Sequence, residues 1–302
     1  MSGLAFLFPG QGSQVVGMGG DLVEHFPTAA ALFRQADELL SFPLSRLCFE
    51  GPEEDLRQTV VTQPALFVHS AAACLVLQER GVRPAWVAGH SLGEYSALVA
   101  AGVFDFATGL ELVRRRGQLM QEARQGSMAA VLGLEDGQVV EICNQVPGAV
   151  AANFNAPGQV VISGEAETVD RAGKLMTEAG AKRVVPLPVS GAFHSPLMAP
   201  AARELAGLLG AVKFRLPQVP VLTNVAAAPV SDPAVLQEQL IQQMTSPVRW
   251  TAIMQSLAAL GVEEALEVGP GNVLRGLARR AAPQVKVAGA GTAEELAALG
   301  GG

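Results

Sequence analysis

Short runs of apolar residues recur along the chain next to glycine or proline, and each run predicts a buried strand. The first run covers residues 4–8, immediately before Pro9. Similar runs cover 85–88, 219–222, 264–268 and 285–288. Longer segments between them predict helices at 28–40, 65–79, 94–101, 105–124, 196–209, 233–244 and 248–260, and a last one that ends at Ala281. Strands that alternate with helices are typical of an α/β fold with a parallel sheet at its centre.

The middle of the chain follows a different order. Residues 128–133 predict a strand, and the elements after it run helix, strand, strand, helix, strand. These later elements cover 136–146, 148–153, 159–164, 166–179 and 182–187. The β-α-β-β-α-β order predicts a ferredoxin-like small domain, residues 126–195, inserted into a large α/β domain, residues 1–125 and 196–302. The Ala/Gly-rich end of the chain, up to Gly302, is predicted to be frayed.

A serine lies between two glycines where the strand at 85–88 gives way to the helix at 94–101. The five residues Gly89-His90-Ser91-Leu92-Gly93 fit G-x-S-x-G, the nucleophile elbow of α/β-hydrolase-like folds. The turn is tight, so a Cβ at either glycine would collide with neighbouring backbone. It would lift the Ser91 hydroxyl above the sheet edge, beside the N-terminus of the next helix. A glycine-rich turn with an incidental serine has the same pattern, so the motif alone leaves both interpretations open.

A serine nucleophile needs a general base, which is most often histidine, and the chain has four histidines. His25 lies in an amphipathic helix and His69 in the apolar helix at 65–79. His90 adjoins Ser91, so its side chain leaves the turn in another direction. His194 lies in a loop after the small domain, where catalytic residues concentrate, and is the candidate base. Its alternative is a loop histidine that caps the following helix. No acidic residue stands out as its partner, and there is no H-G-G-G motif.

Composition and charge exclude several classes of protein. The net charge of −7 argues against binding to nucleic acid or an anionic membrane. The three cysteines are far apart, which supports neither a disulfide framework nor a zinc site. We expect no signal peptide and no uncharged apolar run that spans a bilayer. The glycine-rich stretch 9–14 lacks both G-x-G-x-x-G and G-K-[ST], so no nucleotide-cofactor motif is present. The chain is predicted to be a soluble cytoplasmic protein.

Several motifs occur together in one order along the chain. They are Pro9-Gly10-Gln11-Gly12-Ser13-Gln14, Thr62-Gln63-Pro64-Ala65, Gly89-His90-Ser91-Leu92-Gly93-Glu94-Tyr95, Arg116-Gly117-Gln118-Leu119-Met120, Asn153-Phe154-Asn155-Ala156-Pro157-Gly158-Gln159, Ala192-Phe193-His194 and Glu267-Val268-Gly269-Pro270-Gly271. In these motifs, from Phe6 to about Leu277, the sequence resembles the malonyl-CoA:acyl carrier protein transacylases and the related acyltransferases of polyketide synthases. Each motif alone is only moderately specific, but the ordered set is very specific.

The resemblance implies an acyl transfer in two steps through a serine ester. Ser91 would take the malonyl group, and His194 would remove its proton and later activate the carrier thiol. The backbone N–H groups of Gln11 and Leu92 would form the oxyanion hole. Arg116 would bind the free malonyl carboxylate with its planar guanidinium.

Further residues receive roles from the same resemblance. The backbone carbonyl of Arg249 would orient His194 in place of an acid. Phe193 would mark the malonyl-selective form of its loop, and Gln63 and Asn155 would contact substrate.

The resemblance also implies malonyl-CoA and a holo acyl carrier protein as partners, in fatty acid biosynthesis. We further predict no cofactor, no metal and a monomer. Carrier proteins in this role are acidic, so we predict a local basic patch among Lys182-Arg183, Arg275 and Arg279-Arg280. Three alternatives remain: a serine esterase or thioesterase, a non-catalytic carrier-binding homologue, and a polyketide-pathway acyltransferase acting in trans.

Overall fold

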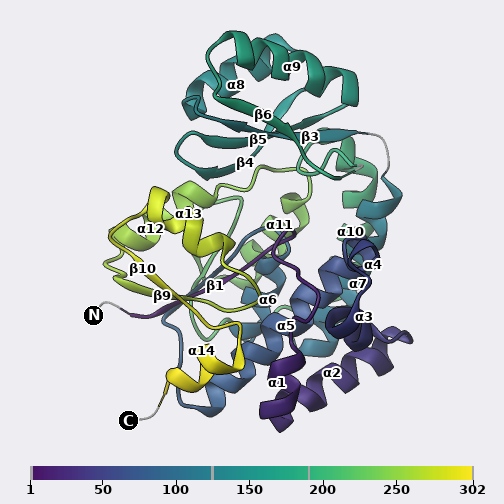
Figure 1. The fold of residues 1–302 in the computed structure, drawn as a ribbon, viewed down its shortest axis with the longest axis vertical. Helices are drawn as coiled ribbons and strands as arrows, with labels where there is room; N and C mark the ends of the chain where they lie inside the picture. The colour runs from purple at the N-terminus through teal and green to yellow at the C-terminus, as the bar shows by residue number, and fades with distance from the viewer. Residues whose placement is uncertain (1–2, 124–125, 190, 301–302) are drawn as a thin grey trace.

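The computed structural model describes residues 3–123, 126–189 and 191–300. Figure 1 shows a larger α/β part with a second, smaller sheet lying against one end of it. The larger part contains a six-stranded sheet in the order β10-β9-β1-β2-β7-β8. Its strands are β1 (Ala5–Phe8), β2 (Trp86–Gly89), β7 (Val221–Leu222), β8 (Pro229–Val230), β9 (Glu264–Glu267) and β10 (Lys286–Gly289). All neighbours pair in parallel except β7 and β8, so the predicted parallel core is confirmed.

Helices cover both faces of this sheet (Figure 1). They are α1 (Gly20–His25), α2 (Pro27–Leu40), α3 (Leu44–Glu50), α4 (Glu53–Leu56), α5 (Thr59–Glu79), α6 (Gly93–Ala100), α7 (Phe106–Glu122), α10 (Ala199–Ala211), α11 (Pro233–Gln243), α12 (Trp250–Ala259), α13 (Val273–Ala281) and α14 (Ala293–Ala298). A short 3-10 helix, Pro196–Met198, precedes α10.

The Asp105 side chain caps α7 by accepting a hydrogen bond from the Thr108 N–H at 2.9 Å. Arg124, the predicted end of that helix, lies outside the described residues.

Helix α5 differs from its prediction at its start. It begins at Thr59 instead of residue 65, so Pro64 lies inside the helix and not at its first turn. By length and composition alone α5 could cross a membrane. However, 83% of its apolar window is buried inside the protein. Its side chains pack in the main core with those of α7 and α2, which accounts for an apolar helix without an amphipathic face.

The smaller sheet has four antiparallel strands in the order β4-β5-β3-β6. Its elements are β3 (Ser127–Leu132), α8 (Asp136–Gln145), β4 (Val150–Ala156), β5 (Gln159–Gly164), α9 (Ala166–Glu178) and β6 (Arg183–Pro186). Side chains alternate between the two faces of a strand. On β5, Val160 and Ile162 join a core under α8 and α9, whereas Val161 joins the core of the larger part. The sheet therefore closes over the carboxyl ends of β1 and β2, and a site can form between the two sheets.

The C-terminal segment is ordered, contrary to the prediction of a frayed tail. Thr292 and Glu295 form a capping box at the start of α14. The Arg80 guanidinium donates hydrogen bonds to the carbonyls of Ala297, Leu299 and Gly300 at 2.7–2.8 Å. These bonds occupy carbonyls at the end of α14 and hold the chain through residue 300. Gly302 itself lies outside the described residues.

Candidate active site

Ser91 lies in a strained turn between β2 and α6, as the elbow motif predicts. Its backbone has a φ of +50°, in the left-handed region. A Cβ on Gly89 would lie 1.9 Å from the carbonyl carbon of Gly93, and one on Gly93 would lie 2.1 Å from the Phe8 oxygen. Both contacts are with backbone, so neither glycine has room for a side chain. The turn is therefore set by the two glycines and leaves the Ser91 hydroxyl at the end of the strand.

His194 meets the Ser91 hydroxyl directly. Its Nε2 lies 2.8 Å from Ser91 Oγ, and its Nδ1 lies 3.1 Å and 3.0 Å from the carbonyl oxygens of Gln243 and Ser246. A carbonyl oxygen only accepts, so Nδ1 must carry the proton and donate it. Nε2 is then unprotonated and accepts from the Ser91 O–H. This is the geometry of a hydroxyl with a general base in place.

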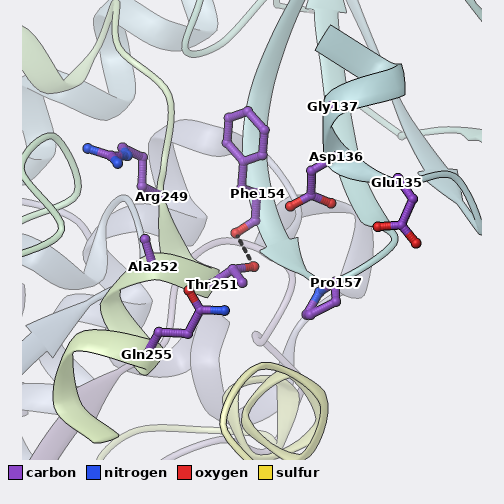
Figure 2. Close-up of a pocket in the computed structure, with 9 residues that line it drawn as sticks. All are labelled: Glu135, Asp136, Gly137, Phe154, Pro157, Arg249, Thr251, Ala252 and Gln255. Carbon is purple, nitrogen blue, oxygen red and sulfur yellow. Dashed lines mark hydrogen bonds between the residues drawn. The ribbon is translucent and has the colours of Figure 1, made fainter. Parts of the chain in front are cut away.

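The carbonyl that orients His194 is not the one predicted. Arg249 is the N-cap residue of α12, and its carbonyl accepts the first helical hydrogen bond from Ile253 N–H at 3.0 Å. Figure 2 shows the Arg249 side chain at a separate cavity of about 490 Å³ beside α12 and the start of α8. The prediction for Arg249 is therefore wrong. Gln243 at the end of α11 and Ser246 after it supply the carbonyls, because the chain there turns its backbone toward the imidazole.

Burial keeps His194 neutral. The side chain is 5% exposed, and burial together with the nearby Arg116 charge lowers its pKa to about 3. Both effects disfavour the imidazolium. The free protein therefore holds His194 as a base throughout the neutral range.

Arg116 places a buried cation beside the hydroxyl. Three successive arginines on a helix cannot share one face. Arg114 and Arg115 are partly exposed and pair with glutamates, whereas Arg116 is 1% exposed. Its Nη2 donates to Ser91 Oγ at 2.9 Å, and its Nη1 donates to Gln63 Oε1 at 2.9 Å. Among the described residues no carboxylate lies within ion-pair distance of it. The site therefore offers an anionic group a positive charge that has no direct carboxylate partner.

Comparison with known proteins identifies the family. The family described as acyl transferase domain matches residues 5–296, nearly the whole chain. The chain belongs to the acyl transferase family. It is 46% identical to the malonyl CoA-acyl carrier protein transacylase of Bacillus subtilis, over 95% of this chain and 92% of that protein. The resemblance stated from the motifs is thus confirmed.

Solved structures agree with this assignment. An acyl carrier protein S-malonyltransferase from Vibrio cholerae superposes with a TM-score of 0.95 at 47% identity, covering 98% of this chain and 99% of that one. A malonyl-transacylase in complex with a type II polyketide synthase acyl carrier protein gives a TM-score of 0.95 at 43% identity, with 98% of each chain covered. The α/β fold with a second antiparallel sheet is therefore the fold of these acyl transferases.

Most of the predicted site residues of this acyl transferase line one cavity of about 160 Å³. Its lining contains Gln11, His90, Ser91, Leu92, Arg116, Met120, Met128, Asn153, Asn155, Val161, Leu187, Val189, Phe193 and His194. Gln63 lies behind this lining, where its Oε1 accepts from Arg116 at 2.9 Å and its Nε2 donates to Met120 Sδ at 3.1 Å. Asn155 lies 2.8 Å from His90 Nε2, so it ties β4 to the elbow. Apart from Arg249, the structure thus brings the predicted residues together.

Three residues that the sequence prediction missed hold the acyl transferase site in shape. Asn224 accepts from the Ser91 N–H at 2.7 Å through its side chain, and Gln243 Nε2 donates to the Ser91 carbonyl at 3.0 Å. Gln243 Oε1 also accepts from Arg116 Nη2 at 3.1 Å. Glu94 Oε2 accepts from both partners, from the Asn224 N–H at 2.9 Å and Gln243 Nε2 at 3.0 Å. The signal for Glu94 was a lone acid in an otherwise apolar helix, whereas Asn224 and Gln243 carry no local pattern.

Proposed function

We propose that this acyltransferase moves a malonyl group from malonyl-CoA to the phosphopantetheine thiol of an acyl carrier protein, through an ester on Ser91. The observation that carries the proposal is the Arg116 guanidinium, buried without a carboxylate partner among the described residues and 2.9 Å from Ser91 Oγ. A free carboxylate at the far end of the acyl group could form a bidentate ion pair with this guanidinium. The names of the relatives from Bacillus subtilis and Vibrio cholerae support the same substrate and acceptor.

In the first half-reaction the Ser91 oxygen attacks the thioester carbonyl while His194 Nε2 takes the hydroxyl proton. The 2.8 Å contact between these atoms supplies the path for that proton. When the tetrahedral intermediate collapses, the C–S bond breaks and His194 returns the proton to the CoA sulfur. The carbonyl oxygens at Nδ1 hold the imidazole in place and stabilise its transient charge.

The developing negative charge on the carbonyl oxygen needs donors. Gln11 and Leu92 both line the cavity beside Ser91, and we assign their backbone N–H groups to the oxyanion hole. Leu92 immediately precedes α6, so the dipole of that helix favours the same charge. One such donor contributes about 3 kcal/mol to transition-state stabilisation.

In the second half-reaction the carrier thiol gives its proton to His194, and its sulfur attacks the ester carbonyl. The C–O bond to Ser91 then breaks, and His194 returns the proton to the Ser91 oxygen. The ester must survive while CoA leaves and the carrier binds. The cavity favours this because much of its lining is apolar, including Met120, Met128, Val161 and Phe193. We assign to Phe193 the restriction of the acyl group to unsubstituted malonyl. A single methyl group is worth about 1–3 kcal/mol in such a pocket.

We propose that the carrier binds basic side chains on the surface. Arg279 is exposed on α13, and Lys182 and Arg183 are exposed at the start of β6. Arg280 instead donates to Gln159 Oε1 and the Pro157 carbonyl, which links α13 to the smaller sheet. We therefore assign the main carrier contact on α13 to Arg279.

The proposed reaction uses side chains and backbone of one chain, so a monomer without metal or cofactor is sufficient for it. All three cysteines are free and buried, which fits the reducing cytoplasm.

The transfer is tested by mixing the enzyme with malonyl-CoA and a holo carrier protein and following malonyl-carrier by mass spectrometry. We expect parallel double-reciprocal lines when both substrates are varied, as a ping-pong scheme requires. The apo carrier, which lacks the thiol, is the control and should receive nothing. Intersecting lines, or malonate released in place of malonyl-carrier, would refute the proposal.

A further inference from the structure

Two buried ionisable groups of the site are joined through one amide. Arg116 Nη2 donates to Gln243 Oε1 at 3.1 Å, and Gln243 Nε2 donates to Glu94 Oε2 at 3.0 Å. Both charged side chains are almost completely excluded from solvent, at 1% and 0% exposed. A buried guanidinium is costly without a counter-charge. Among the described residues, Glu94 is the carboxyl group that the hydrogen bonds connect to it.

The hydrogen bonds of Glu94 allow it to change its charge without rearrangement. Both contacts of Oε2 are with donors, the Asn224 N–H and the Gln243 amide. Its other oxygen, Oε1, has no hydrogen-bond partner among the described residues. A proton on Oε1 leaves Oε2 as a carbonyl-type oxygen that still accepts both bonds. Protonation therefore leaves Asn224, Gln243 and the Ser91 backbone in position.

We propose that Glu94 is a positioning residue that is ionised while Arg116 is unpaired and takes up a proton when a substrate carboxylate occupies Arg116. This inference rests on the proposed function, because it requires an acyl group with a free carboxylate. It adds that substrate binding is coupled to a proton at a residue that does not touch the substrate.

The electrostatics of the site favour this coupling. Before substrate binds, the Arg116 charge stabilises the Glu94 carboxylate through the bridging amide. A substrate carboxylate on Arg116 adds a second negative charge to the same buried cluster, which favours the neutral form of Glu94. Burial already raises the pKa of Glu94 to about 7, so a further rise lies within the working range.

The other titratable groups around Glu94 do not take up a proton in the neutral pH range. Tyr95, next to it on α6, has its pKa raised to about 12 by burial. Burial lowers the pKa of His194 to about 3 and also lowers that of His90, so both are neutral. Asn224 and Gln243, which face Glu94 from the segment after β7 and from α11, do not titrate.

Acylation itself consumes no proton from solvent. The Ser91 proton passes through His194 to the CoA sulfur, and the C–S bond that breaks is replaced by the C–O bond of the ester. Any proton that is taken up during malonyl-enzyme formation must therefore bind to another group of the protein. The only other contribution is the small ionisation of the CoA thiol that is released. That ionisation is identical for every variant and cancels on comparison.

The test measures proton uptake with an indicator dye when excess enzyme reacts with malonyl-CoA at pH 7.5, with the adduct counted by intact-protein mass. We expect about half a proton or more per adduct for the native enzyme, from a group with a pKa near neutrality. Glu94→Gln, which mimics the neutral acid in shape, should take up none. Glu267→Gln is the matched control. It removes a carboxylate that is also 0% exposed and accepts from two backbone N–H groups, but at the start of α13. This variant should take up as much proton as the native enzyme.

The pH dependence gives a second readout that does not depend on the dye. For the native enzyme kcat/KM for malonyl-CoA should fall above pH 7, by up to about tenfold per pH unit, since free enzyme must then gain a proton. Glu94→Gln should remove this fall. Equal proton uptake by the native enzyme and Glu94→Gln, or an unchanged pH profile in that variant, would overturn the inference. Absence of any adduct in the native enzyme would instead refute the proposed function.

Discussion

Replacing Arg116 by alanine tests whether this guanidinium selects the substrate. The side chain is 1% exposed and donates to Gln63, Ser91 and Gln243, so alanine removes a buried cation and leaves the Gln63 and Gln243 side chains in place. The carboxylate of malonyl-CoA then enters a buried site with no partner. Neutral acetyl-CoA has no such group and loses only the contact that Arg116 makes with Ser91 Oγ.

The expected magnitude follows from the burial of the ion pair. Truncating one member of a buried, hydrogen-bonded charge pair costs about 2–5 kcal/mol, and each 1.36 kcal/mol is tenfold in rate, so kcat/KM for malonyl-CoA should fall by about 30- to 5,000-fold. For acetyl-CoA the fall should be smaller, about 10- to 150-fold, because one hydrogen bond to a charged group contributes about 1.5–3 kcal/mol. The ratio of the two rates is therefore the informative quantity.

The assay is the release of CoA in the presence of holo carrier, measured for both thioesters. Arg115→Ala is the matched control, because Arg115 is the same residue type one position earlier and pairs with Glu204 at the surface. This variant should keep the native preference for malonyl. If Arg116→Ala reduced both thioesters by the same factor, Arg116 would serve only to hold the site together, and the argument from its charge would be refuted.

Three further predictions concern the base, the elbow and the carrier. Because the pKa of His194 is lowered to about 3, kcat/KM for acylation should stay level from pH 7 down to about pH 5, and a tenfold loss per unit below pH 6.5 would contradict this. Gly93→Ala would place a Cβ 2.1 Å from the Phe8 oxygen, so we expect little folded protein by circular dichroism, and a native melting curve would argue against the tight elbow. Arg279→Glu should raise KM for the carrier several-fold and leave acylation by malonyl-CoA unchanged. Arg275 is already paired with Glu267 and Glu295, so Arg275→Gln should raise KM for the carrier less than Arg279→Glu does. Equal increases in the two variants would argue against a specific carrier contact at Arg279.

Features encoded by neighbouring residues were predictable from the sequence. The strand, glycine and serine of the elbow lie within a few positions of one another, and close packing leaves no other residue type room at Gly89 and Gly93. The order of strands and helices likewise follows from local apolar runs. The start of α5 was missed because Pro64 is typical of a first helical turn, yet here the helix continues through it. The capping box of α14 was visible as Thr292 and Glu295 but was outweighed by the small residues around it.

Contacts between distant segments were not predictable from local pattern. Gln243 and Ser246 reach His194 from about 50 positions away, and nothing in their neighbourhood distinguishes their carbonyls from that of Arg249. The same is true of the Asn224 contact with the Ser91 backbone. Such positions are set by how α11 and the segment after β7 pack against the elbow, which requires the tertiary structure.

The seryl ester is tested most directly by intact-protein mass spectrometry after mixing with malonyl-CoA, with peptide mapping of the adduct. We predict one malonyl group per chain, located on Ser91 and absent in Ser91→Ala. Addition of holo carrier should remove this group from the native enzyme. Thr251→Ala, which removes a hydroxyl at the separate cavity of Figure 2, should acquire the adduct normally. Steady release of CoA and malonate without an adduct would rule out the transferase mechanism and indicate a thioesterase.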